Sequence, residues 1–97
     1  MTKEEVLENA KNAVADRGLN YGAPEDNFER VANLWSVHMK NRRDSTADIE
    51  AHDVAIMLLL LKVARLQNNA YHLDSWVDAA GYAACGGQIV SFTGDES

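Results

Sequence analysis

The chain has 97 residues, of which 46% are hydrophobic and 25% are charged, a balance typical of one small globular domain and not of a disordered or fibrous chain. Its 15 acidic and 9 basic residues give a net charge of -6 at pH 7, which disfavours a role in coating DNA or binding anionic lipid. A domain of this size buries only about two-thirds of its unfolded surface, so association with further copies would stabilise it.

The cysteine content and the first residues favour an intracellular protein. Cys85 is the only cysteine, so no disulfide can form within the chain. Residues 1–5 lack the basic and then apolar pattern of a signal peptide. The longest apolar run, residues 54–61, is far shorter than the about 20 residues that span a bilayer. We therefore expect a cytoplasmic protein with no membrane partner.

The first half of the chain predicts two helices. Thr2 and Glu5 have the spacing of a capping box, and apolar residues then recur with helical period over about residues 3–17. Pro24 suits the first position of a second helix, because its missing N–H is not needed there. We expect this helix over about 24–40. Its apolar stripe consists of Phe28, Val31, Ala32, Trp35 and Met39.

The second half predicts two further helices. Ser45 or Thr46 can cap a third helix over about residues 46–67, which is apolar nearly all round and therefore suits the buried centre of the fold. A fourth helix is expected over about 73–86, where a glycine pair ends or frays it. The short polar tail, 91–97, has no assigned role.

These elements predict an all-α fold in which residues 1–97 form a single domain. Short connections favour a compact antiparallel four-helix bundle with a buried central helix. Small side chains dominate residues 79–84, so a second helix can approach closely there, either within the chain or across a dimer interface. We expect a homodimer or a higher oligomer. Trp35, Trp76 and Cys85 are expected to be buried.

Antiparallel packing would gather polar residues at one end of the bundle. With a rise of about 1.5 Å per residue, Asp26 and Glu29 at the start of the second helix come level with the last turns of the third. Those turns carry Lys62 and Arg65. The fourth helix opens beside the same turns. Its polar face there, by i, i+4 spacing, carries Asp74, Asp78 and Tyr82.

The loop before the second helix leads into this end and adds Arg17, Tyr21 and Gly22. Carboxylates are the ligands that Mg²⁺ prefers, Lys62 and Arg65 suit phosphate oxygens, and Tyr21 can stack on a base. Gly22 would allow a ligand to approach the backbone. The pattern therefore indicates a site for a phosphorylated ligand. The alternative is an intramolecular salt-bridge network, although four carboxylates are more than two cations need.

Another candidate lies at the opposite end of the third helix. Residues 50–53, Glu-Ala-His-Asp, could hold a metal ion, but acidic residues near a helix start also favour the helix dipole, and we prefer that interpretation of Asp53. The three histidines and Cys85 are too scattered along the chain for a zinc site.

Four stretches carry a family resemblance. They are Arg17-Gly18-x-x-Tyr21-Gly22-x-Pro24-Glu25-Asp26-Asn27-Phe28, Asp53-Val54-Ala55, Leu61-Lys62-Val63-Ala64-Arg65-Leu66 and Asp74-Ser75-x-Val77-Asp78-x-Ala80-Gly81-Tyr82. Over nearly its whole length the chain resembles a family of small uncharacterised phage and prophage proteins. More distantly, the Tyr-Gly loop, the Lys-x-x-Arg helix and the Asp-x-x-x-Asp helix are similar to the all-α nucleoside triphosphate pyrophosphohydrolases, the MazG-like and dimeric dUTPase-like proteins.

The distant resemblance implies helix-borne carboxylates that hold Mg²⁺ and a nucleotide cleaved between its α and β phosphates. The catalytic metal ligands would be Asp74 and Asp78, helped by Asp26 or Glu29. The substrate-binding residues would be Arg17, Tyr21, Asn27, Lys62, Arg65 and Tyr82. The chain departs from those enzymes at Ser75, which stands where a Glu before Asp78 is expected. Loss of a metal ligand would leave a fold that binds nucleotides without cleaving them.

Three hypotheses follow for a chain of this kind. It is a Mg²⁺-dependent nucleotide pyrophosphohydrolase of phage nucleotide metabolism; or a non-catalytic sponge that sequesters a linear or cyclic nucleotide second messenger of host antiviral defence; or a helical bundle whose acidic surface binds another protein. All three place the chain in the host cytoplasm if a phage encodes it.

Overall fold

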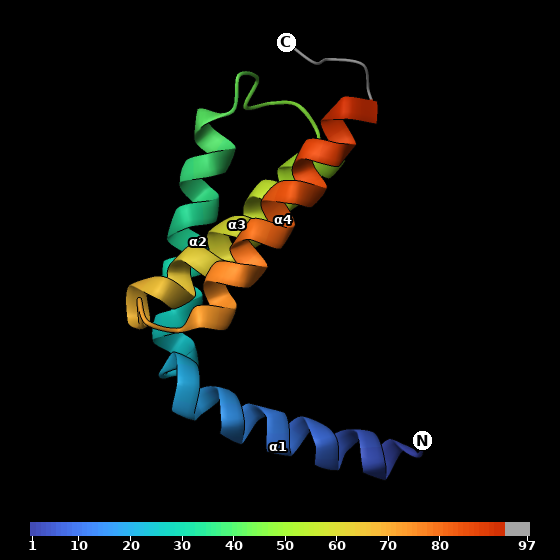
Figure 1. Cartoon of the computed structure of the whole chain (residues 1–97), viewed down its shortest axis with the longest axis vertical. Helices are drawn as coiled ribbons and strands as arrows, with labels where there is room; N and C mark the ends of the chain where they lie inside the picture. Colours follow the sequence, from blue (N-terminus) through green and yellow to red (C-terminus); the bar gives the residue numbers. More distant parts are fainter. Residues whose placement is uncertain (93–97) are drawn as a thin grey trace.

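The computed structural model describes residues 1–92, except for the side chain of Asn20, and is built from four helices (Figure 1). These are α1 (Lys3–Tyr21), α2 (Pro24–Asn41), α3 (Ala51–Asn68) and α4 (Leu73–Phe92). No strand occurs in this part of the chain, so the all-α prediction is confirmed. Of the tail expected over 91–97, the first two residues end α4 and 93–97 lie outside the described residues.

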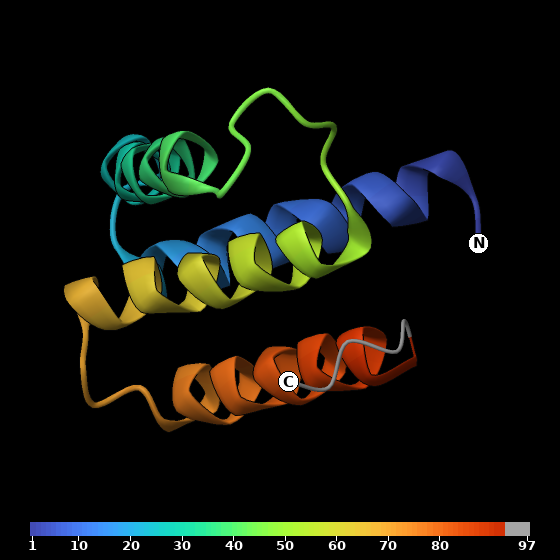
Figure 2. The same ribbon diagram turned by 90° about the horizontal axis from the view of Figure 1, so that it is seen from above.

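Helix α3 lies between α2 and α4; α4 runs antiparallel to α3, whereas α2, seen nearly end-on in Figure 2, crosses α3 at a steep angle. The register of α2 on α3 is set by Trp35, whose Nε1 donates to the Met57 carbonyl over 2.6 Å. The register of α4 on α3 is set by an ion pair in which Lys62 Nζ lies 2.9 Å from Asp78 Oδ2. The prediction that the third helix is central is confirmed. It carries most of the buried residues of the described chain, namely Asp53, Ala55, Lys62 and Ala64.

Helix α1 does not join this bundle within one chain. It leaves α2 at Gly22, whose φ of 81° lies in the left-handed region that favours glycine, and it projects away from the other helices (Figure 1). A Cβ at this position would lie 3.1 Å from Asn68 Oδ1, so the lack of a side chain at Gly22 leaves room for Asn68. The close approach to the Gly22 backbone, predicted for a ligand, is made by this side chain. A single chain therefore forms a three-helix bundle with an extended helical arm.

The start of α3 predicted near residue 46 is wrong. Asp44 accepts hydrogen bonds from the backbone and side chain of Thr46, at 3.0 and 2.7 Å, and these local turns compete with a helix. The helix begins at Ala51 instead, because Glu50 and Asp53 form a reciprocal capping box. The residues between α2 and α3 are therefore an irregular connector.

Helices α1 and α4 are longer than predicted. Helix α1 continues to Tyr21, and α4 continues through the glycine pair to Phe92. A Cβ at Gly86 would lie 3.3 Å from the Ala55 Cβ, so this glycine allows α4 to pack tightly on α3. Gly86 serves close packing between the helices, and neither glycine of the pair ends the helix.

The core of one chain is small. Among the described residues, the buried apolar side chains are Val31, Ala55 and Ala64, and the buried polar ones are Asn27, Asp53, Lys62 and Ser75. The expectation that Trp76 and Cys85 are buried is wrong for a single chain, because Trp76 is 55% exposed and Cys85 is exposed. Within this part of the chain, no helix combines the length and apolar character needed to cross a bilayer.

Candidate phosphate site and its counterpart at the other end of the bundle

One end of the bundle gathers polar side chains from α1, α3 and α4. The guanidinium Cζ of Arg65 lies 4.2 Å from the centre of the Tyr21 ring, a cation–π contact. The His72 ring meets the same tyrosine edge-on, with the ring centres 5.4 Å apart, and His72 Nδ1 shares a 2.7 Å hydrogen bond with Ser75 Oγ. These four residues, Tyr21, Arg65, His72 and Ser75, are called the Tyr21 cluster below.

Arg65 is the residue of this cluster whose charge is not balanced. Its Nε is buried without a hydrogen-bond partner, and it forms no ion pair within the part of the chain that the structure describes. The Arg65 side chain as a whole is half-buried, so its shielded Nε loses water without gaining another acceptor. The Tyr21 ring offsets only part of this loss, so the site suits an anionic ligand.

Lys62 lies one turn before Arg65 on α3 and is buried. Its Nζ is 2.9 Å from Asp78, whose side chain is half exposed. The cation thus already has one carboxylate partner, which an incoming phosphate would have to share or displace. Lys62 and Asp78 are neighbours of the Tyr21 cluster, as the antiparallel register predicts.

Asn27 lies in the first turn of α2. Its neighbours Pro24 and Phe28 line a cavity at the junction of α1 and α2. Its side chain is 5% exposed, and its Oδ1 has no hydrogen-bond partner among the described residues. A buried acceptor without a donor is unusual in a folded protein, and a ligand hydroxyl or amino group would satisfy it.

Arg17 and Tyr21 line a cavity of about 220 Å³ at the junction of α1 and α2. Its other lining residues are Val14, Gly18, Gly22, Pro24 and Phe28. This cavity is mostly apolar with one cation at its wall. Arg17, Tyr21 and Arg65 thus lie at one end of the bundle, with Lys62 one turn away on α3, and the binding of a substrate by these residues stays a prediction.

Tyr82 lies elsewhere. It lines a separate apolar cavity of about 280 Å³ between α3 and α4, next to Ala55 and Gly86. It shares a helix face with Asp78 but is a full turn further from the Tyr21 cluster. His72 and Ser75, by contrast, belong to the cluster although no sequence signal indicated them beyond Ser75 standing where the resembling enzymes carry a Glu.

The four carboxylates expected to hold Mg²⁺ do not assemble within one chain. Asp26, Glu29, Asp74 and Asp78 are all exposed. In the described part of the chain, they do not bring three ligand atoms within 4.8 Å of one another, and neither Asp26 nor Glu29 is ion-paired to a cation. These residues therefore form no group of three metal ligands within the described part of one chain.

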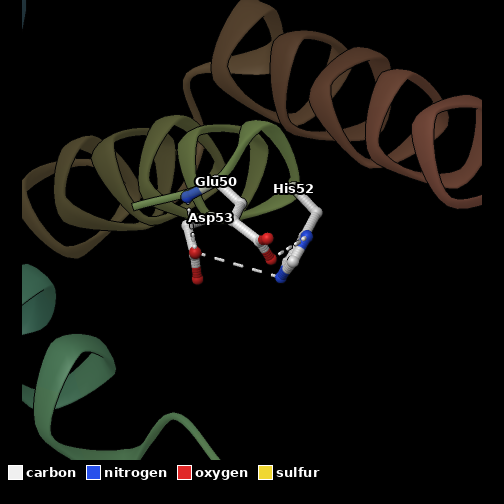
Figure 3. Close-up of side chains that lie close together, drawn as sticks. All are labelled: Glu50, His52 and Asp53. Atoms are coloured by element: carbon white, nitrogen blue, oxygen red, sulfur yellow. Dashed lines mark hydrogen bonds and ion pairs between the residues drawn. The ribbon is translucent and has the colours of Figure 1, made fainter. Parts of the chain in front are cut away.

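The opposite end of α3 holds a second polar group around Asp53 (Figure 3). Asp53 is 3% exposed, and its carboxylate accepts from the Glu50 backbone at 3.0 Å, from His38 Nε2 at 3.1 Å and from Arg42 Nη1 at 3.4 Å. The Glu50 N–H is the main cause that holds the pKa of Asp53 below its usual value, against the opposing effect of burial, with His38, His52 and Arg42 adding to it.

Arg42 connects this group to the connector between α2 and α3. Its Nη2 donates to the carbonyls of Ser45 and Ala47 at 3.3 and 2.8 Å, and its Nη1 also donates to that of Asp48 at 3.3 Å. The buried oxygens of Asp53 are thus already used by the protein. Glu50, His52 and Asp53 bring ligand atoms within 4.8 Å, but the adjacent guanidinium disfavours a cation there. The arrangement supports a structural role for Asp53.

A family model described as "Domain of unknown function (DUF6378)" matches residues 5–90. The chain belongs to this family. It is 39% identical over 83 residues to the Gene 55 protein of Mycobacterium phage D29 and 38% identical over 82 residues to the Gene 55 protein of Mycobacterium phage L5. Each alignment covers 84% of this chain but 51% and 46% of the relative, so the chain spans about half the length of the curated relatives it matches. No solved structure matches the chain.

The DUF6378 region contains both polar groups. The matched residues, 5–90, include the whole Tyr21 cluster and Asp53 with its partners. The resemblance to small phage proteins is therefore confirmed at the level of the family. Neither the family description nor the name of either relative states an activity, so the chemistry of the site must carry the functional argument.

Proposed function

We propose that this DUF6378 protein binds a phosphorylated ligand of the nucleotide class at the Tyr21 cluster. The observation that carries the proposal is Arg65, a guanidinium with a buried Nε and no anionic partner among the described residues. Arginine presents several N–H donors in a plane that matches phosphate oxygens, and such charge-assisted hydrogen bonds are among the strongest in proteins. A phosphate would balance this charge.

Neighbouring residues favour a nucleotide over a bare phosphate. The cavity beside Tyr21 is mostly apolar and has a volume of about 220 Å³, below the range of roughly 300–1,000 Å³ typical of sites that enclose a whole drug-sized ligand. It suits one part of a ligand, such as a base. Arg17 in its wall is a second cation, and the unpaired Oδ1 of Asn27 is an acceptor for a ligand hydroxyl or amino group.

The geometry favours binding without cleavage. Hydrolysis between phosphates would require Mg²⁺, and the carboxylates expected to hold it do not meet in one chain. Asp78, one of the two expected catalytic residues, faces Lys62 in an ion pair. The sponge hypothesis, in which the protein sequesters a nucleotide second messenger of host defence, needs only the binding site. We therefore place it ahead of the pyrophosphohydrolase hypothesis.

Isothermal titration with a panel of nucleoside triphosphates and cyclic nucleotides, each with and without Mg²⁺, tests the proposal. We expect one class of nucleotide to bind, and chromatography of the recovered ligand to show it intact. Recovery of a cleaved product only with Mg²⁺ would instead support the enzyme. No binding of any nucleotide would contradict the proposal and favour the third hypothesis, a protein-interaction bundle.

The variant Arg65→Ala should weaken binding at least about tenfold, the effect of losing one charge-assisted contact of roughly 1.5–3 kcal/mol. Arg43→Ala is the matched control, since Arg43 is exposed and lies at the opposite end of the bundle, near Asp53. Both substitutions remove one positive charge. Equal losses of affinity in the two variants would show that only net charge matters and would contradict a site at the Tyr21 cluster.

A further inference from the structure

The apolar stripe of α1 is mostly exposed in its own chain. Leu7 is 69% and Val14 is 62% exposed, and Val6 and Ala10 of the same stripe are also exposed. A helix of 19 residues gains most of its stability from packing an apolar face, since its intrinsic propensity alone is marginal in water. An arm of this kind requires an apolar surface to pack against.

The dimensions of the whole chain support the same conclusion. Its accessible surface is 7255 Å², whereas a globular monomer of 10.7 kDa would expose about 5,500 Å². Its radius of gyration is 16.1 Å, against about 12.5 Å for a compact chain of this length. The excess surface, roughly 1,750 Å², is of the size that one chain buries in an obligate dimer, about 1,000–2,500 Å².

A groove of suitable character lies between α2 and α3. It has a volume of about 320 Å³, and every residue that lines it is apolar or aromatic: Phe28, Val31, Ala32, Trp35 and Leu61. Its one polar group, the Trp35 indole N–H, is already bonded to the Met57 carbonyl. The groove between α3 and α4 is less suitable, because His52 and Tyr82 bring polar atoms into it.

The groove and the base of α1 form a continuous apolar surface. Phe28 lines both the groove and the cavity at the junction of α1 and α2. Helix α1 is about 28 Å long and α2 about 27 Å, so one can lie along the other over its whole length. A chain that carries both an apolar helix and an apolar groove can form two equivalent contacts around a two-fold axis.

We propose that α1 of one chain packs into the groove between α2 and α3 of a second copy, and that the reciprocal contact closes a homodimer. Each groove then receives a fourth helix, so each bundle is completed by the arm of the other chain. The stripe residues Leu7 and Val14 become buried in this arrangement. The proposal does not rest on nucleotide binding, but the two sites share surface, since Val14 and Phe28 also line the cavity beside Tyr21.

Sedimentation velocity without any nucleotide tests the assembly directly. We expect a species of about twice the 10.7 kDa of one chain at micromolar concentration, and an unfolding midpoint that rises with protein concentration. A monomer of 10.7 kDa with a concentration-independent midpoint would overturn the proposal, and this measurement needs no variant to fold.

Two pairs of variants locate the interface. Leu7→Glu places a charge on the stripe, and Ala32→Arg places one in the groove; each should weaken the dimer at least tenfold. Asn12→Glu, on the opposite face of α1, and Asn33→Arg, on the face of α2 opposite the groove, add the same charges at exposed positions and should leave the mass unchanged. A dimer that survives both test variants would overturn this interface.

Mixing the two weakened variants distinguishes this pairing from other apolar contacts. The Ala32→Arg chain keeps an intact α1, and the Leu7→Glu chain keeps an intact groove, so a mixed dimer has one complete contact out of two. The mixture should therefore dimerise more strongly than either variant alone. If the mixture is no more dimeric than its components, α1 does not dock in this groove.

Discussion

Asp53 and Arg65 are charged residues at opposite ends of α3, and the protein surrounds them differently. Asp53 is reached by a backbone N–H, a histidine and a guanidinium, all within 3.4 Å. Arg65 has an aromatic ring at 4.2 Å and a buried Nε without a partner. The buried carboxylate of Asp53 has its partners within the chain and serves the fold, whereas the half-buried guanidinium of Arg65 has no anionic partner among the described residues and is available to a ligand. The network around Asp53 therefore fixes the connector between α2 and α3, and the end of α3 that carries Arg65 is the candidate site.

The largest loss of stability is expected from breaking the network around Asp53. Arg42→Ala removes the guanidinium that joins Asp53 to three connector carbonyls and leaves the buried carboxylate with fewer donors. Breaking a buried pair from one side costs roughly 3–5 kcal/mol. Urea unfolding at fixed protein concentration should show a loss of about 3 kcal/mol or more in the free energy of unfolding.

Arg65→Ala tests the other end of α3, where we expect little loss of stability. This guanidinium has no anionic partner in the described chain, so its removal should cost no more than about 1 kcal/mol, the scale of the lost contact with Tyr21. The two variants remove the same side chain from opposite ends of the bundle. If Arg65→Ala were as destabilising as Arg42→Ala, the charge of Arg65 would be a structural element and the comparison would fail.

A smaller loss of stability is expected at low pH. The pKa of Asp53 in the folded protein lies below 3.8, its usual value and the value expected in the unfolded chain, mainly because of the Glu50 N–H. The ionised carboxylate therefore stabilises the fold above about pH 5, and this contribution is lost as the pH falls through 3.8 and then through the folded-state pKa. The unfolding midpoint should fall across that range.

Asp53→Asn isolates this contribution. The variant should be less stable than the parent at pH 7, and its midpoint should depend less on pH between about 5 and 2, since the titrating group is absent. Asp48→Asn is a matched control at an exposed position of the same connector. Parallel pH curves for the parent and Asp53→Asn would show that other carboxylates cause the acid response.

Local signals in the sequence predicted the parts of the fold that depend on nearby residues. Pro24 marks the start of α2, and Thr2 caps α1 by accepting from the Glu5 N–H at 3.1 Å. The start of α3 was placed too early, because Ser45 and Thr46 are also common cap residues. Residue type and spacing do not show that Thr46 instead bonds Asp44 in a local turn, while Glu50 and Asp53 form the capping box.

The helical rise per residue predicted which residues of α3 belong to the site, but it did not predict the side chains that contact them. It brought Lys62 and Arg65 to the end where Tyr21 lies, as the structure shows. It could not show which side chains turn inward at the helix starts. Ser75 on α4 and His72 just before it do so, while Asp26 on α2 stays exposed. The extended arm was also beyond prediction, because one backbone angle at Gly22 decides its direction.

The smallest expected effect separates binding from catalysis at Asp78. Its half-exposed carboxylate neutralises Lys62 at 2.9 Å and so competes with a phosphate for that cation. Under the binding proposal, Asp78→Asn should raise nucleotide affinity by about two- to fivefold, the worth of a partly exposed ion pair. Asp74→Asn, one turn earlier on α4 and exposed, removes the same charge and should change affinity less.

Titration calorimetry of both variants measures the difference. If Asp78→Asn instead left affinity unchanged and abolished a Mg²⁺-dependent cleavage seen in the parent, Asp78 would be a metal ligand and the pyrophosphohydrolase hypothesis would replace the sponge.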